Sequence, residues 1–320
     1  MRRWAFALVV ASGCSLTVGT PPTPTPTPTP APTSAPRSPA PAPARLTGDI
    51  VFASDRGGPS QLYGMPAAGG RATQITFDVA QHLFPDWSPD GISLAYTLVP
   101  GPQATVDIHV LSGAGVDRAL THDSAFDGSP AWSPDGQQLA FESAPIGQPG
   151  IVTLDEGGDR ASRNPLTGGA SPAYQPSWSP DGRQIAFALR EPGCIEADLV
   201  CVQHVWVMTP TGRRMTQLTG DDEHDGEPAW SPDGAMIAFS TNRAGGNFDI
   251  WVMRADGSDL RRLTSAEGID INPEWSPDGR MIAFTSARDG NLEIYVMAAD
   301  GTAQTDITDS PGDDFSPTWR

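Results

Sequence analysis

Four aspartates and one histidine occupy the same place in a repeated pattern, five residues before a tryptophan. They are His82, Asp127, Asp225, Asp270 and Asp314, and the sixth equivalent position holds Ala173. A ring of such groups concentrates negative potential, which would attract a cation or a basic peptide segment. Aspartate in a turn also caps its own loop by accepting backbone N–H groups. The pattern therefore predicts either a binding ring or separate loop caps, and Ala173 favours an asymmetric cleft over a symmetric metal cage.

Two cysteines, Cys194 and Cys201, lie seven positions apart in the longest repeat unit. Outside the cytoplasm, two such thiols form a disulfide more often than a metal site. A zinc site would need a companion pair of cysteines, which the sequence does not supply. We therefore predict a disulfide between them that stiffens an insertion.

Motifs of catalysis and of cofactor binding are missing from the sequence. It has no Gly-x-Ser-x-Gly elbow, phosphate loop, His-Glu-x-x-His or dinucleotide fingerprint. Residues 221–226 (DDEHDG) begin like a calcium loop, but Pro232 stands where that loop requires Glu, so a solvated acidic loop is expected. We predict no catalytic residues, no cofactor and no metal.

The charge of the chain restricts its partners. All 20 basic residues are Arg and oppose 38 acidic residues, which gives a formal net charge of −18. Binding to nucleic acid needs clustered cations that neutralise phosphates, so this class of partner is excluded. If the partner is charged, a cationic ligand is favoured.

The first 44 residues predict export and anchoring. Residues 1–14 combine two Arg, a short apolar run and small residues before Cys14, which is typical of a secretory signal. The ending Ala-Ser-Gly-Cys resembles the lipobox of bacterial lipoproteins and implies a lipid on Cys14 as a membrane anchor; the alternative is an ordinary signal peptide with an incidental Cys. Residues 15–44 are rich in Pro, Thr and Ala, and we expect a disordered, extended stalk.

The elements that would hold the ring are read from six repeats. The pentapeptide Trp-Ser-Pro-Asp-Gly starts at five tryptophans, and a sixth opens at the end of the chain: Trp87, Trp132, Trp178, Trp230, Trp275 and Trp319. Each of the five complete pentapeptides is followed by two short apolar strands and a Leu-Thr or Ile-Thr ending, and four short strands per period form a propeller blade. In Ser-Pro-Asp-Gly, the fixed φ of Pro and the terminal Gly favour a tight turn between strands a and b.

The chain ends predict how the ring closes. Residues 49–76 supply strands b, c and d of a blade without strand a, whereas residues 315–320 supply a strand a with nothing after it. Pairing them completes a sixth blade and removes the free sheet edges. We predict an all-β fold: a six-bladed β-propeller over residues 45–320, closed by its N- and C-terminal strands.

The repeat Pro-x-Trp-Ser-Pro-Asp-Gly-x-x-Ile-Ala-Phe, followed by Ile-Tyr-Val-Met and Asp-Gly, resembles the WD40-like repeat of the TolB propeller and of propellers that precede some serine-peptidase domains. The resemblance covers residues 45–320 and implies the fold without implying a function. TolB carries an α/β domain ahead of its propeller where this sequence has a stalk, so its partners are not carried over. The peptidases need a C-terminal hydrolase domain, whereas this sequence ends at Arg320.

Two functions remain open. Because the b–c and d–a loops share one face, and length variation is confined mainly to the b–c loops, we expect function on that face. The first hypothesis is a non-catalytic binding or scaffolding protein of the cell envelope that meets an envelope protein or a cationic ligand. The alternative is a propeller enzyme, such as a polysaccharide lyase or hydrolase, with His82, Arg243 and Arg288 around the channel mouth.

Overall fold

A computed structural model describes most of the chain after residue 48. The described residues are 49–101, 104–144, 149–158, 162–168, 171–191, 202–220 and 222–320. Their regular elements are β-strands, and within these ranges no helix is long and apolar enough to span a bilayer. Cys14, Cys194 and Cys201 lie outside the described residues, as do the signal sequence and the stalk.

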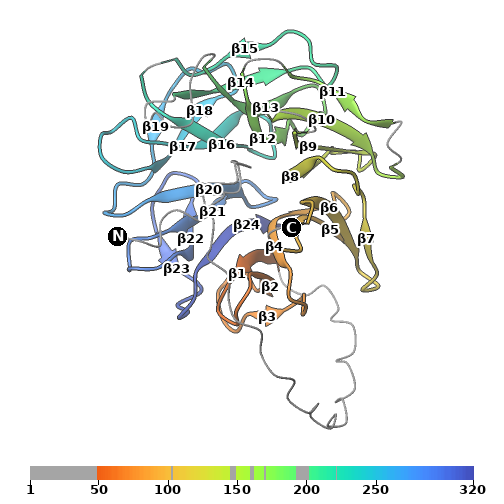
Figure 1. The fold of residues 1–320 in the computed structure, drawn as a ribbon. Helices are drawn as coiled ribbons and strands as arrows, with labels where there is room; N and C mark the ends of the chain where they lie inside the picture. The colour runs from red at the N-terminus through yellow and green to blue at the C-terminus, as the bar shows by residue number, and fades with distance from the viewer. Residues whose placement is uncertain are drawn as a thin grey trace, which may run out of the picture. The chain divides into compact units, whose positions relative to one another are not determined.

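The strands form six antiparallel sheets of four strands each, arranged as blades around an axis (Figure 1). The innermost strands, a, are β4 (Gln81–Trp87), β8 (Phe126–Trp132), β12 (Ala173–Trp178), β16 (Asp225–Trp230), β20 (Asp270–Trp275) and β24 (Asp314–Trp319). Strands b are β5 (Ser93–Val99), β9 (Gln138–Ala144), β13 (Ile185–Arg190), β17 (Met236–Thr241), β21 (Met281–Ser286) and β1 (Ile50–Ser54). The predicted six-bladed propeller is confirmed.

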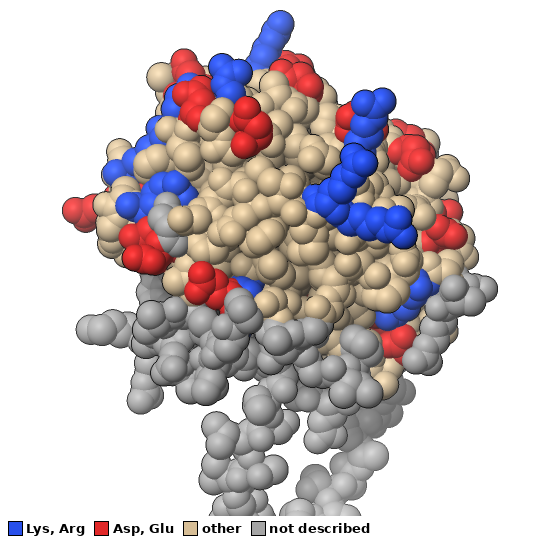
Figure 2. Space-filling view, turned by 90° about the horizontal axis from the view of Figure 1, so that it is seen from above, with Lys and Arg blue, Asp and Glu red and all other residues tan. Residues whose placement is uncertain are grey.

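The outer half of each blade consists of strands c and d. Strands c are β6 (Asp107–Ser112), β10 (Gly150–Asp155), β14 (Gln203–Met208), β18 (Asp249–Arg254), β22 (Glu293–Ala298) and β2 (Gln61–Met65). Strands d are short: β7 (Asp117–Ala119), β11 (Asn164–Pro165), β15 (Thr216–Gln217), β19 (Arg261–Arg262), β23 (Thr305–Asp306) and β3 (Thr73–Gln74). On the face seen from above, basic and acidic side chains are interspersed around a broad area of other residues (Figure 2).

The two ends of the propeller share one blade, as predicted. Strand β1 pairs antiparallel with β24, with Ile50 opposite Trp319 and Ser54 opposite Asp314, so the sheet order is β24-β1-β2-β3. Every backbone edge that an open ring would expose at this point is therefore paired.

The Ser-Pro-Asp-Gly turns have the predicted geometry. In the turn between β4 and β5, Gly91 N–H donates to the carbonyl of Ser88, and the Ser88 hydroxyl donates to Oδ1 of Asp90 at 2.6 Å. Gly91 has φ of +66°, a conformation that suits glycine. The sequence thus encodes strand a, a tight turn and strand b in a single motif.

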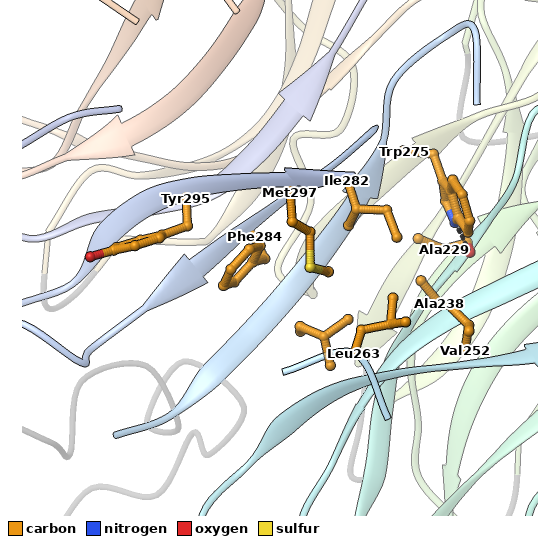
Figure 3. Packing of buried hydrophobic residues seen from close by; sticks show 10 residues of the cluster. Ala229, Ala238, Val252, Leu263, Trp275, Ile282, Phe284, Tyr295 and Met297 are labelled. Atoms are coloured by element: carbon orange, nitrogen blue, oxygen red, sulfur yellow. Dashed lines mark hydrogen bonds between the residues drawn. The ribbon is translucent and has the colours of Figure 1, made fainter. Parts of the chain in front are cut away.

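Apolar side chains fill the space between adjacent blades (Figure 3). Residues Ala229, Ala238, Ile250, Val252 and Leu263 of one blade pack against Trp275, Ile282, Phe284, Tyr295 and Met297 of the next. Because each sheet is packed on both faces, its strands read as nearly continuous apolar runs. This packing holds the inner strands at fixed positions around the axis.

Candidate functional site

The structure places the four aspartates of the predicted ring at the start of strands a, where each is completely buried and ion-paired with an arginine. The pairs are Asp127–Arg163, Asp225–Arg243, Asp270–Arg288 and Asp314–Arg56. The nitrogen–oxygen separation is 2.8 Å in the second pair and 2.9 Å in the third. A buried carboxylate needs such a partner, because desolvation otherwise disfavours its charged form strongly.

Three of these arginines come from equivalent places, two residues after the end of strand b. They are Arg56, Arg243 and Arg288, and each guanidinium lies over an aromatic ring of strand b and another of strand c. Arg288, for example, is 5.4 Å from the ring centroid of Phe284 and 4.5 Å from that of Tyr295. The recurrence of Ser/Thr-x-Arg after strand b was a signal that the sequence analysis did not use.

The blade of His82 has a different arrangement. His82 is buried, its ring stacks on Tyr96 at 5.0 Å, and Tyr96 in turn contacts His109. Nε2 of His82 lies 2.9 Å from Oδ1 of Asp78. Burial lowers the pKa of His82 below its usual value, and the hydrogen bond to Asp78 opposes that shift. An imidazole stacked on a phenol thus stands at the position where four other blades have a buried aspartate.

The ring is therefore formed of compensated charges. A ligand could reach these aspartates only by displacing an arginine, and the role of the ring in binding stays a prediction. The loop caps are made by other residues: Asp78 accepts the N–H of Ala80, and Asp123 accepts the N–H of Ala125. Both caps lie two residues after the Thr that ends strand d.

A second ring lies deeper along strands a, at the residue three positions before each tryptophan. All six of these residues have positive φ: Phe84, Ser129, Gln175, Glu227, Asn272 and Ser316. In five blades the N–H of this residue donates to a side chain of the preceding blade: Ser129 to Thr97, Gln175 to Glu142, Glu227 to Gln175, Asn272 to Glu227 and Ser316 to Thr285. These hydrogen bonds link adjacent blades around the channel.

Burial raises the pKa of two carboxyl groups that accept hydrogen bonds from the second ring. Burial raises the pKa of Glu142 to about 7, against the lowering effect of the hydrogen bond from the N–H of Gln175. Burial likewise raises the pKa of Glu227, which accepts hydrogen bonds from Ser240 and from the N–H of Asn272. Both carboxyl groups are therefore shifted toward the protonated form.

A cavity of about 590 Å³ opens at the axis on the face of the a–b turns. We call it the turn-face mouth. It is lined by Trp87, Trp230, Trp275, Trp319, Glu274, Arg320 and the turns that follow the first three of these tryptophans. Turns from adjacent blades touch, as Gly279 does Pro232, and leave this opening in the middle. The sequence favours function on the opposite face, because a tight turn within one blade leaves little space for a site. This cavity instead lies between the turns of different blades.

Two acids meet near the turn-face mouth, each directly before a tryptophan. Glu274 lines the mouth, and the pKa of its carboxyl is raised well above the usual range, first by burial and then by the charge of Asp86. Burial raises the pKa of Asp86 to about 7, although Asp86 Oδ2 accepts the N–H of Trp132 at 2.7 Å. Within the described part of the chain, Glu274 has neither a hydrogen bond nor an ion pair.

Metal chemistry finds no support in the described residues. No group of three or more His, Cys, Asp or Glu side chains there could hold a metal ion. The segment that resembles a calcium loop begins at residue 221, outside the described residues, and within it Asp225 pairs with Arg243. The residues offered for an enzyme each have an aspartate partner: His82 contacts Asp78, Arg243 pairs with Asp225 and Arg288 pairs with Asp270.

Comparison with solved structures shows the fold. TolB from Acinetobacter baumannii is 20% identical, with a TM-score of 0.72 over 87% of this chain and 68% of that one. A putative TolB from Agrobacterium tumefaciens is 21% identical, with a TM-score of 0.64 over 86% of this chain and 99% of that one. An oligogalacturonate lyase in complex with manganese is 17% identical, with a TM-score of 0.56 over 81% of this chain and 73% of that one.

Comparison with sequence families shows the relationship. No curated protein matches the chain. The family model described as the TolB beta propeller domain (PD40) matches residues 83–203 and 204–320, which together are most of the chain. The chain therefore belongs to the TolB beta propeller domain family.

Proposed function

We propose that this chain is a non-catalytic binding protein of the cell envelope that takes its partner at the turn-face mouth. The observation that carries the proposal is the mouth itself, where turns from several blades surround a cavity that contains an unpaired carboxyl group. Concave sites with apolar walls and a few polar groups are typical of binding sites. A rigid ring of six packed blades presents such a site without any movement of its scaffold.

A location outside the cytoplasm is part of this proposal. It rests on residues 1–14, which have the pattern of a secretory signal, and on membership of the TolB propeller family. A lipid on Cys14 would tether the domain, and residues 15–44 would separate it from the membrane. The enzyme alternative is less favoured, because its candidate residues are separately paired in the structure.

Site-specific crosslinking tests which face binds. We would place a photoreactive amino acid at Asp278, which is exposed on an a–b turn beside the mouth, in the full chain in its own cells. The matched control is the same substitution at Glu267, an exposed acid in a long loop of the same blade. The proposal expects one discrete adduct from position 278 and none from 267. Adducts from 267 alone, or from neither position, would overturn it.

A further inference from the structure

One acid lines the turn-face mouth, and a second acid stands at the equivalent position two blades away. Glu274 is in β20 and Asp86 is in β4, and both occupy the position directly before the tryptophan of strand a. Strand β24, which lies between them around the axis, places the small residue Thr318 at that position. The charge of Asp86 raises the pKa of Glu274, which agrees with their closeness.

Glu274 lacks the arginine partner that accompanies the ring acids. Asp225, Asp270 and Asp314 are each neutralised by an arginine that stacks on aromatic rings. At the mouth, Glu274 likewise lines a cavity together with four tryptophans. No arginine or lysine of the described residues pairs with Asp86 or Glu274. Compared with the ring aspartates, Glu274 is an acid close to aromatic rings that has no arginine partner.

The guanidinium of Arg320 already contacts a tryptophan that lines this cavity. Arg320 lies 4.4 Å from the ring centroid of Trp87 and donates to the carbonyl of Gly91 at 2.9 Å. It contacts the indole face and leaves Glu274 unpaired. Cation–π contacts of this kind strengthen when the cation is desolvated, as it would be deeper in the mouth.

We infer that the turn-face mouth binds the guanidinium or ammonium group of a basic segment in a partner protein, held by the carboxylate of Glu274 and the surrounding indoles. The inference rests on the proposed function and names the chemistry of its ligand. A side chain of this kind supplies a counter-charge for Glu274, and the cavity of about 590 Å³ has room for it. A charge-assisted hydrogen bond to Glu274 would fix its position.

Binding should release a proton. Burial and Asp86 raise the pKa of Glu274, whereas a bound cation favours the carboxylate, so affinity should increase as the pH rises. The other charged groups that line the mouth are Asp90, in the turn after β4, and Arg320, after β24. Hydrogen bonds from Ser88 and from the N–H of Ile92 lower the pKa of Asp90, so it stays charged, and Arg320 is held at Trp87 and Gly91. Burial raises the pKa of Asp86, so this acid acts in the same direction as Glu274.

Calorimetry with defined peptides tests the inference. Acetylated, amidated tri-arginine would be titrated into the full chain at low salt, with the tri-citrulline peptide as a neutral control of the same shape. We expect Glu274→Gln to weaken tri-arginine binding about tenfold or more, since it removes one partner of a buried charge pair. Glu267→Gln, an exposed acid of the same blade, should bind like the wild type. Heats in buffers of different ionisation enthalpy should show proton release by the wild type and less by Glu274→Gln.

The outcomes separate the two proposals. Equal binding of both peptides, equal binding by Glu274→Gln, or no binding by the wild type would each overturn the cation site. If an adduct still forms from position 278 in that case, the proposed function survives and only the ligand class is wrong. If that adduct is missing as well, both proposals fail. Should Glu274→Gln not fold, judged by its melting temperature, Asp86→Asn takes its place in the same titration.

Discussion

Replacing Arg56 with Met should destabilise the ring at its closure. Arg56 follows β1, and its partner Asp314 begins β24, so this ion pair joins the first and last strands of the propeller. The side chain of Asp314 is completely buried, and that of Arg56 is 21% exposed. Met preserves the packing over Phe52 and Tyr63 but leaves a buried carboxylate unpaired. Breaking a buried pair in this way costs about 3–5 kcal/mol of unfolding free energy.

Denaturant unfolding of the full chain measures this loss. The control is Arg280→Met, because Arg280 is 84% exposed and pairs with Asp278, a contact worth about 0–1 kcal/mol. The loss for Arg56→Met should be smaller at pH 5 than at pH 8, since burial raises the pKa of Asp314 and protonation removes the stranded charge. Adding Asp314→Asn should restore part of the stability. A loss no larger than that of the control would refute the reasoning.

Three further predictions follow from features described above. A chain that stops before β24 should melt at a lower temperature throughout, because its first sheet keeps an open edge; melting like the intact chain would contradict the closure. Burial raises the pKa of Asp86 and Glu142 to about 7, and a raised carboxyl pKa favours folding at pH values below it. Unfolding free energy should therefore fall between pH 5 and pH 8 in the wild type more steeply than in Glu142→Gln, and parallel curves would oppose this. Cys14→Ser should move the protein from the membrane fraction to the soluble one; unchanged fractionation would rule out lipidation.

The fold was predictable because its information is local and repeated. Each Trp-Ser-Pro-Asp-Gly specifies the end of a strand, a turn and the start of the next strand within five residues. The closure was predictable because residues 49–76 form a blade that lacks strand a, whereas residues 315–320 form a single strand a. Pairing the two completes one blade. Both conclusions required only the order of elements along the chain.

The sites were less predictable because they depend on which residues meet in space. Asp314 and its partner Arg56 are 258 positions apart. The sequence pattern therefore showed the recurring aspartates without the arginines that pair with them. The turn-face mouth escaped prediction for a related reason: each turn is tight, and only turns of several blades together surround an opening. A usable signal was present, because acids precede the tryptophan only at Asp86 and Glu274, where the other repeats have Ala, Ser or Thr.

The pairing of β1 with β24 also delays the completion of the first sheet until the end of synthesis. Strand β1 is made early, but the strand that completes its sheet lies about 260 residues later. At synthesis rates of about 5–20 residues per second, the edge of β1 waits about 10–50 s for its partner. Contacts of such long range form slowly, and an unpaired edge can join another chain in the meantime. The first blade is thus exposed to misassembly for as long as the ring is unfinished, and the period ends only when the last strand arrives.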